Sequence, residues 1–196
     1  MIGVVTDCMM LDNDTMSKAQ EEFWKEYLDK DAEKFDAAMH IIKAVKSNYP
    51  FHLPSLIDGV VVWSHCSIHP LSQIGKGTVV GFGVNITGAI KIGKNVRIQS
   101  YVFIPEGVTI EDRVFIGPRV TFTNVKYPKV RDRDPKVFNK TLVKEGASIG
   151  AGSIIGTDLT IGEGALVGMG SVVLKDVKPN WIVRGNPAHH IRKITY

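Results

Sequence analysis

The stretch that decides the fold runs Ile98-Gln99-Ser100-Tyr101-Val102-Phe103-Ile104-Pro105-Glu106-Gly107-Val108-Thr109-Ile110. Its isoleucines stand six positions apart, and the spacing extends both ways, through Val62, Ile68, Ile74, Val80, Ile86 and Ile92 before it and Ile116 and Phe122 after it. A second run follows an interruption, at Val143, Ile149, Ile155, Ile161, Val167 and Val173. Glycine often follows the aliphatic residue, and a small or β-branched residue often stands four positions after it. Such self-similarity indicates a repeat architecture.

A period of six matches neither the helical period near 3.6 nor the strand period of 2. Short strands that turn a corner every six residues would each bury one aliphatic side chain, and three of them would make one coil. Coils stacked at roughly 4.8 Å pair their backbone groups with the coils on either side, and glycine supplies turn conformations with positive φ. We therefore expect a mainly β protein, a parallel β-helix prism of about five or six coils at that spacing.

The two ends of the chain differ from this prism, which we place at residues 59–180. Residues 1–58 are expected to form a helical N-terminal extension. Apolar residues recur there at helical spacing between positions 15 and 48, as Phe23, Trp24, Tyr27 and Leu28 and then Phe35, Ala38, Met39, Ile42 and Val45. Residues 181–196 are expected to form a C-terminal tail.

Composition limits the class of protein. The chain has 196 residues, 44% of them hydrophobic, which suits one globular domain with an extension. No apolar run is long enough to span a bilayer, and the first residues include Asp7 rather than a basic leader. Cys8 and Cys66 show no disulfide spacing and are interpreted as thiols in a reducing compartment. We expect a cytoplasmic protein that does not enter a membrane.

The charge is distributed unevenly along the chain. Residues 1–60 hold 11 acidic and 6 basic residues, a net charge of 6 − 11 = −5, and the net charge of the whole chain is +4, so the remainder carries +9. A basic half suits an anionic small molecule, nucleic acid or a merely solvated surface. Nucleic acid is the weakest of these alternatives, because no zinc-ligand array, aromatic RNA-binding motif or basic helix is present.

The interruption of the repeat is the main functional signal. Phe122 and Val143 are 143 − 122 = 21 positions apart, which is not a multiple of six, so residues 124–141 are expected to protrude from the prism as a loop. The loop carries Lys126, Lys129, Arg131, Arg133, Lys136 and Lys140. A long excursion from a rigid scaffold favours a functional role, the alternative being a mobile surface loop.

Several motifs resemble the bacterial hexapeptide-repeat nucleotide-sugar N-acetyltransferases. They are residues 107–118, Phe122-Thr123-Asn124-Val125, Thr141-Leu142-Val143-Lys144 and Val183-Arg184-Gly185-Asn186-Pro187-Ala188. The match is best with enzymes acting on UDP-2-acetamido-3-amino-2,3-dideoxyglucuronate, and related enzymes act on dTDP-linked amino sugars. The resemblance covers about residues 62–192 and leaves residues 1–58 outside. It also implies that the β-helix is left-handed. The six-residue period alone does not indicate the hand, and parallel crossover connections in general are usually right-handed.

This resemblance implies a homotrimer that transfers an acetyl group from acetyl-CoA to the C3 or C4 amine of a UDP- or dTDP-linked amino sugar, for surface glycan biosynthesis. It implies active sites between adjacent prisms. No metal is expected, because the sequence offers no zinc-binding set of residues. Asn124 matches the residue that lies against the sugar amine, so its side-chain oxygen would orient the nucleophile. The sugar nucleotide is expected near Asn124 and the residues Gln99, Glu106 and Lys126.

CoA is expected along the second run of repeats. Its pantetheine arm would meet the backbone around Gly150, Ala151 and Gly168. The side chains that would reach its phosphates are Lys175, Arg184 and Arg192.

Other functions stay open at this stage. A hexapeptide O-acetyltransferase acting on another small acceptor and a non-catalytic solenoid scaffold are both compatible with the repeat. A zinc carbonic anhydrase on the same prism needs a His pair at a spacing that this sequence lacks. Related antibiotic acetyltransferases carry Asn-His where this chain has Asn124-Val125, which argues against a histidine base from the loop. His65 and His69 are interpreted as structural or surface residues.

Overall fold

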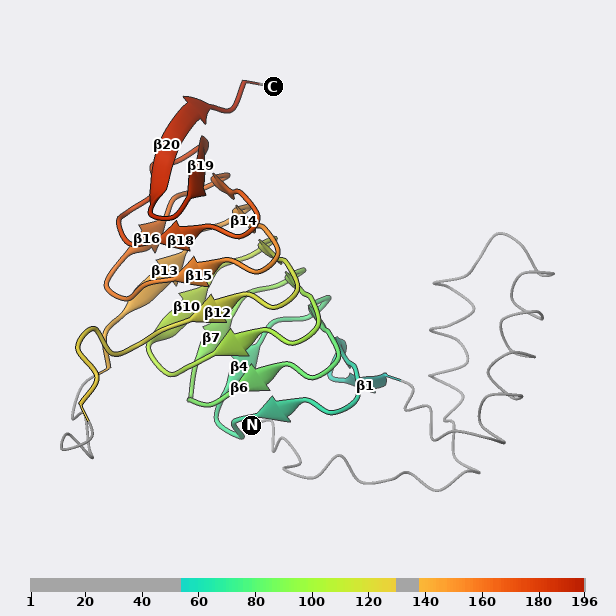
Figure 1. Cartoon of the computed structure of the whole chain (residues 1–196). Coiled ribbons are helices and arrows are strands. Elements are labelled where there is room, and N and C mark those ends of the chain that lie inside the picture. The colour runs from blue at the N-terminus through green and yellow to red at the C-terminus, as the bar shows by residue number, and fades with distance from the viewer. Residues whose placement is uncertain (1–53, 130–137, 196) are drawn as a thin grey trace, which may run out of the picture.

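The computed structural model describes residues 54–129 and 138–195, and within them the chain forms strands and turns without an α-helix (Figure 1). The helices expected between positions 15 and 48 lie outside the described residues. The strands are β1 (Ser55–Ile57), β2 (Val60–Val62), β3 (Ser67–Ile68), β4 (Gln73–Ile74), β5 (Val79–Val80), β6 (Asn85–Ile86), β7 (Lys91–Ile92), β8 (Arg97–Ile98), β9 (Phe103–Ile104), β10 (Val108–Ile110), β11 (Phe115–Ile116), β12 (Thr121–Phe122), β13 (Thr141–Val143), β14 (Ser148–Ile149), β15 (Ile154–Ile155), β16 (Thr160–Ile161), β17 (Leu166–Val167), β18 (Val172–Val173), β19 (Trp181–Gly185) and β20 (Ala188–Lys193).

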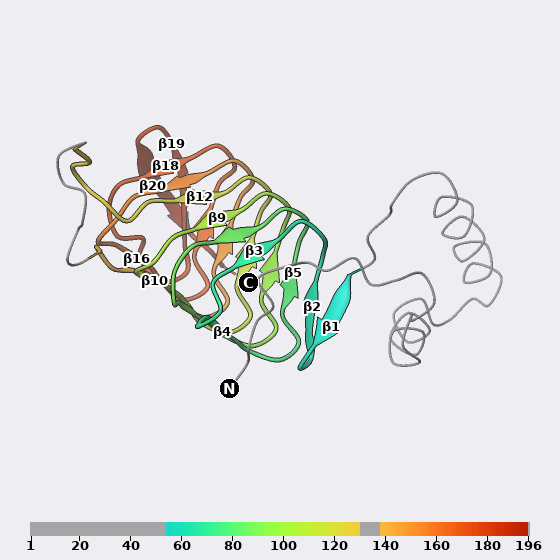
Figure 2. The same ribbon diagram turned by 90° about the horizontal axis from the view of Figure 1, so that it is seen from below.

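Within the described residues, these strands form three sheets that are the sides of a prism (Figures 1 and 2). Sheet A has the order β1-β2-β5-β8-β11-β14-β17-β19-β20, sheet B contains β3-β6-β9-β12-β15-β18, and sheet C contains β4-β7-β10-β13-β16. The chain visits A, B and C in turn, so each strand pairs in parallel with the strand one coil later, as Val80 does with Ile98. The predicted parallel β-helix is thus confirmed.

We number the coils from the N-terminal end. Coil 1 is β2–β4, coil 2 β5–β7, coil 3 β8–β10, coil 4 β11–β13 and coil 5 β14–β16. Coil 6 contains β17 and β18 and closes on sheet C through a parallel bridge between Ile161 and Val177. Three sheets also define three corners, which we call A–B, B–C and C–A after the sheets that each joins.

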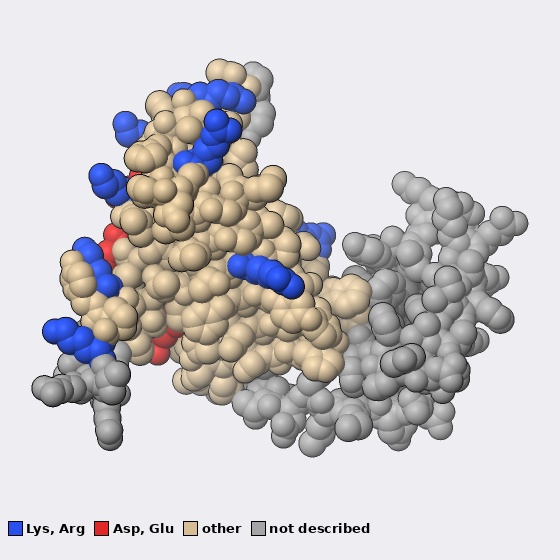
Figure 3. All heavy atoms as spheres, in the orientation of Figure 1, with Lys and Arg blue, Asp and Glu red and all other residues tan. Residues whose placement is uncertain are grey.

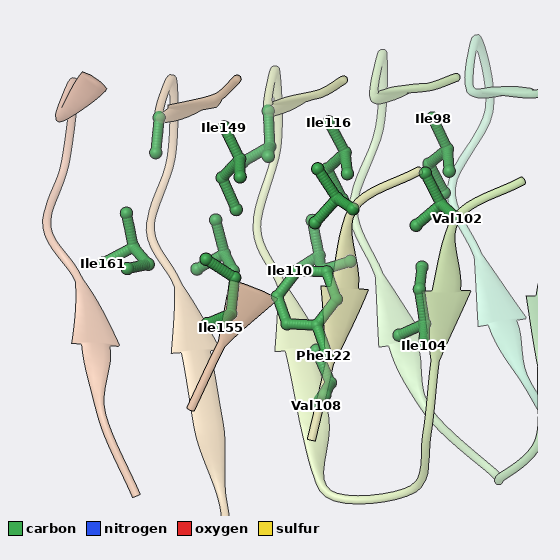
Figure 4. Close-up of a cluster of buried hydrophobic side chains, with 14 of the residues drawn as sticks. Ile98, Val102, Ile104, Val108, Ile110, Ile116, Phe122, Ile149, Ile155 and Ile161 are labelled. Atoms are coloured by element: carbon green, nitrogen blue, oxygen red, sulfur yellow. The ribbon is translucent and has the colours of Figure 1, made fainter. Parts of the chain in front are cut away.

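The residues that repeat every six positions fill the interior (Figure 4). Most of them are fully buried, including Ile98, Ile104, Ile116, Phe122, Val143, Ile149, Ile155 and Ile161, all with 0% of their surface exposed. In coil 1 the same positions are only partly buried. Phe122 therefore continues the inner ladder, as predicted.

A second buried column holds the residue four positions after each inner aliphatic, and small side chains fit there because the corner narrows the interior. Thr78 and Ser153 occupy this column, and their hydroxyls donate to a carbonyl of the following coil: Thr78 Oγ1 to Gly93 O at 2.9 Å and Ser153 Oγ to Gly168 O at 3.0 Å. These bonds satisfy polar groups that would otherwise be costly to bury.

Antiparallel strands end sheet A on both sides. At the first end β1 pairs with β2, Leu56 lying opposite Val61. At the other end β19 joins β17 in parallel, and β20 folds back antiparallel to β19. The C-terminal tail is therefore a hairpin that extends the solenoid.

The glycine after an inner aliphatic is required by the close approach of neighbouring coils. A Cβ atom built on Gly117 would lie 2.6 Å from the backbone nitrogen of Ala151 in the next coil. We expect Gly117→Ala to lower the free energy of unfolding by about 1–3 kcal/mol, the usual cost of overpacking. Urea unfolding monitored by circular dichroism measures this change in the free energy of unfolding.

Gly146→Asn is the matched control. Gly146 has a φ of +67° with nothing within 4 Å of its added Cβ, and Asn95 adopts a φ of 55° at the same corner. Asparagine tolerates this conformation better than most residues, so the control should stay close to the wild type. Equal losses for the two variants would contradict the packing explanation.

Candidate functional site

The protruding loop leaves the prism at the B–C corner of coil 4 (Figure 1). Strand β12 ends at Phe122 and β13 begins at Thr141. One corner normally separates inner residues by six positions, so the separation of 21 corresponds to an insertion of 21 − 6 = 15 residues. Thr141, the last residue of the expected loop, is already in β13, with only 2% of its surface exposed.

Asn124 is fixed at the outgoing side of the loop. Its Nδ2 group donates a hydrogen bond of 3.0 Å to the backbone carbonyl of Glu106, one coil below. Its own carbonyl accepts a bond of 3.1 Å from the Asn139 backbone amide on the returning side. Because Nδ2 is the donor in the first bond, the side-chain oxygen Oδ1 remains as the acceptor that a ligand can use.

The returning side of the loop is held at two further points. Asn139 Nδ2 donates to Asp158 Oδ2 at 2.7 Å, and the Thr141 amide donates to the Gly107 carbonyl at 3.0 Å. Gly107 has a φ of +94°, and a Cβ atom there would lie 2.4 Å from the Asn139 carbonyl oxygen. Hydrogen bonds therefore hold the two sides of the loop base together and join them to coils 3, 4 and 5.

The residues predicted to bind the sugar nucleotide fall into two groups. Glu106 and Asn124 lie in neighbouring coils at the B–C corner, and Lys126 is exposed in the adjoining loop, with its Nζ atom 5.9 Å from the ring centroid of Tyr127. Gln99 follows Ile98 of sheet A and so lies at the A–B corner. The structure brings the first three together and puts Gln99 on the other edge of sheet B.

Most residues predicted to bind CoA line up along the A–B corner. Gly150 and Ala151 belong to coil 5 and Gly168 to coil 6, and Arg184 follows at the end of the column. The amides of Gly150 and Gly168 already donate within the solenoid, to Val167 O and Val183 O at 2.8 Å. A ligand here would instead meet the exposed Ala151 and the side chain of Arg184.

The other two residues predicted to bind CoA lie away from this column. Lys175 is exposed at the B–C corner of coil 6, and Arg192 is on β20 opposite Ile182. On the face drawn in Figure 3, Lys and Arg side chains gather over the C-terminal hairpin and the loop, while the middle is largely uncharged. Basic groups at that end of the solenoid suit the phosphates of an anionic ligand.

The two histidines of coil 1 have local partners. His65 occupies an A–B corner with a φ of 61°, its ring centroid 4.8 Å from that of Phe82. His69 Nδ1 accepts a hydrogen bond of 3.3 Å from the Leu71 amide. In the described part of the chain, no three His, Cys, Asp or Glu side chains are grouped to hold a metal ion. No helix among the same residues could cross a membrane.

Sequence reasoning missed Gly107, Asn139 and Asp158. A signal existed for Asp158, because it stands three positions after Ile155, where the corner requires a left-handed residue; its φ is 58°. Asn139 lies inside the insertion, where the six-residue spacing gives no position. The buried Thr157 hydroxyl beside Asp158 has no hydrogen-bond partner among the described residues.

Comparison with known proteins agrees with this architecture. Residues 89–124 match the bacterial transferase hexapeptide (six repeats) family. A curated relative, the dTDP-3-amino-3,6-dideoxy-alpha-D-galactopyranose 3-N-acetyltransferase of Aneurinibacillus thermoaerophilus, is 43% identical over 54 residues, which are 28% of each chain. The chain thus matches only about a quarter of that relative's length.

Solved structures share the fold over a longer part of the chain. A hexapeptide-repeat acetyltransferase from Vibrio cholerae in complex with acetyl-CoA is 28% identical, with a TM-score of 0.55 and coverage of 63% of this chain and 72% of that one. An N-acyltransferase from Bacillus cereus in complex with dTDP and CoA is 24% identical, with a TM-score of 0.63 and coverage of 69% and 81%. The repeat and these likenesses define the described part of the chain as a hexapeptide-repeat β-solenoid.

Proposed function

We propose that this protein is an N-acetyltransferase that moves an acetyl group from acetyl-CoA to the C3 or C4 amine of a UDP- or dTDP-linked amino sugar. The reaction would take place in the cytoplasm and serve the biosynthesis of surface glycans. The observation that carries the proposal is the Asn124 amide, fixed at the loop base with its oxygen available as an acceptor. Two further observations support the proposal. The curated relative is named as an acetyltransferase of a nucleotide-linked amino sugar, and the two similar solved structures contain acetyl-CoA or CoA.

The geometry supports a simple acyl transfer. Asn124 Oδ1 accepts a hydrogen bond from one N–H of the neutral sugar amine and so directs the nitrogen lone pair at the thioester carbonyl. The new C–N bond forms as the C–S bond breaks. An asparagine side chain is not a base, so the proton of the amine passes to the departing CoA sulfur or to water.

The position of the two subsites supports a homotrimer. Asn124 is at the B–C corner, whereas Gly150, Ala151 and Gly168 are at the A–B corner, so sheet B separates acceptor and donor subsites on one prism. A second copy that places its A–B corner against this B–C corner would bring them together. Exposed apolar side chains on and beside the A–B corner offer contact surface: Phe115 at 39%, Ile154 at 44%, Leu166 at 37% and Met169 at 82% exposed.

A thermal-shift measurement with acetyl-CoA separates this enzyme from a non-catalytic scaffold. A ligand that binds the folded state at 100 times its Kd stabilises it by about 2.7 kcal/mol, which raises the Tm by several degrees. We expect acetyl-CoA and CoA to raise the Tm, and pantetheine, which lacks the phosphates of CoA, to raise it less. No shift with any acyl-CoA would reject the acyltransferase proposal.

A thiol-release assay then identifies the acceptor. The panel contains 3-amino and 4-amino sugars linked to UDP and dTDP, with the hydroxyl sugars as controls. We expect release of CoA only with an amino sugar. Turnover of the hydroxyl sugars alone would point to an O-acetyltransferase instead.

A further inference from the structure

Asp158 occupies an unusual position next to the loop base. It lies at the B–C corner of coil 5, one coil beyond Asn124, and adopts a φ of 58°. Its Oδ2 atom accepts a hydrogen bond of 2.7 Å from Asn139 Nδ2. The short distance is typical of a hydrogen bond to an ionised carboxylate, which is stronger than one between neutral groups.

The contact belongs to a continuous chain of hydrogen bonds. Asp158 holds the Asn139 side chain, the Asn139 amide donates to the Asn124 carbonyl at 3.1 Å, and the Asn124 side chain donates to the Glu106 carbonyl at 3.0 Å. This series of hydrogen bonds connects coils 3, 4 and 5. It therefore fixes both the backbone and the side chain of Asn124 relative to the rigid solenoid.

Coils 3 and 5 have ordinary corners, so their positions do not depend on the loop. Asn124 and Asn139, in contrast, are the residues at which the 15-residue insertion leaves and rejoins the prism. Without Asp158, the returning limb would keep the bonds of Thr141, from its amide to the Gly107 carbonyl and from its hydroxyl to the Gly156 carbonyl of coil 5. It would lose the bond that fixes the Asn139 side chain to coil 5.

We propose that Asp158 is a positioning residue for the sugar amine: through Asn139 it holds Asn124 at the angle at which Oδ1 meets the amine. The inference rests on the proposed acetyltransferase function. Asp158 touches Asn139 rather than the reacting atoms, so its effect is on the orientation of the acceptor. A displacement of about 1 Å at a reacting group can cost a factor of up to 10² in rate, and loss of one of several supports should cost less, about tenfold.

The contrasting role for an acidic residue here is direct proton transfer. The two roles differ in what the side chain must supply. Positioning needs a hydrogen-bond acceptor, which asparagine also offers through its amide oxygen. Proton transfer needs the carboxylate itself, so asparagine would be as damaging as removal of the side chain.

The test compares Asp158→Gly, which keeps the left-handed backbone but removes the acceptor, with Asp158→Asn and Asn139→Ala in the full chain. We expect Asp158→Gly and Asn139→Ala each to lower kcat/KM for the amino sugar about tenfold, while the KM for acetyl-CoA stays unchanged. Asp158→Asn should stay within about threefold of the wild type, with the same dependence of kcat/KM on pH.

Double variants show whether the residues act as one unit. Asn139→Ala combined with Asp158→Gly should be no worse than either alone, and Asp158→Gly should add little to Asn124→Ala, because coupled residues are not additive. The matched control is Asp112→Asn, whose carboxylate makes a similar bond of 2.8 Å to the Lys94 amide at the distant C–A corner. It should leave kcat/KM unchanged.

Three results would overturn the inference. Unchanged kcat/KM in Asp158→Gly would show that the bond is only structural. Equal losses in Asp158→Asn and Asp158→Gly, with an altered pH profile, would assign proton transfer to the carboxylate. Additive losses in the double variant would separate Asp158 from Asn139. A wild-type chain inactive with every acyl-CoA and amino sugar would reject the proposed function itself, a result distinct from an active wild type with unaffected variants.

Discussion

Replacing Asn124 by alanine is expected to lower kcat/KM for the amino-sugar acceptor by about 10²-fold or more, the range in which loss of alignment at a reacting group falls. The variant removes both the oxygen that would accept the amine's hydrogen bond and the Nδ2 donor that binds the Glu106 carbonyl. The Tm shift produced by acetyl-CoA should persist, because the proposed CoA subsite lies at another corner. Steady-state thiol release measures the effect.

Two companion variants define what Asn124 supplies. Asn124→Asp keeps an acceptor but loses the bond to Glu106, so we expect intermediate activity. Asn95→Gly changes an exposed asparagine with a φ of 55° at the C–A corner, and it should leave kcat/KM at the wild-type value. Wild-type activity in Asn124→Ala would reject the role of this residue while leaving the fold and CoA binding unaffected.

Phe122→Ala should lower the free energy of unfolding by about 3–5 kcal/mol, the usual cost of truncating a buried aromatic residue. Phe122 has 0% of its surface exposed and shares coil 4 with Ile116 and Val143. Its ring fills the interior beside the smaller valine, and the coils on either side are rigid, so the cavity should not collapse. Urea unfolding monitored by far-UV circular dichroism gives the difference.

Phe103→Ala is the matched control. Phe103 precedes the inner Ile104 in the adjacent strand of sheet B, so its side chain points outward and is partly exposed. We expect this control to cost about 1 kcal/mol or less, as is usual for surface positions. A loss for Phe122→Ala no larger than that of the control would contradict the assignment of Phe122 to the inner ladder.

The prism could be predicted from the sequence because its period specifies which residue faces inward. Within each of the two runs, from Val80 to Phe122 and from Val143 to Val173, every inner position follows from counting in sixes, and burial agrees with the count. Counting in steps of eighteen residues, one coil at a time, would also have shown at which corner of the prism each predicted site residue lies. Ile98 and Ile116 share sheet A, and Ile104 and Phe122 share sheet B, so Gln99 and Asn124 had to fall on different corners.

The loop base could not be predicted in this way. The insertion between Phe122 and Thr141 has no period, so nothing in the order of its residues indicates that Asn139 returns to Asn124 or reaches Asp158. The hand of the coil was likewise outside the reach of periodicity, since six-residue spacing is the same in either hand. Local spacing determines the scaffold, whereas contacts between distant segments determine the site.

The antiparallel strands at the two ends of sheet A have a consequence for behaviour in solution. A stack of parallel coils presents, at each end, unpaired amides and carbonyls in the register of its own next coil, which is a template for fibre growth between identical molecules. In sheet A, β1 covers the first coil and the β19–β20 hairpin covers the last, both with reversed strands at the outer edge. An incoming copy would meet a mismatched hydrogen-bond pattern there, so the strand reversal acts against end-to-end polymerisation.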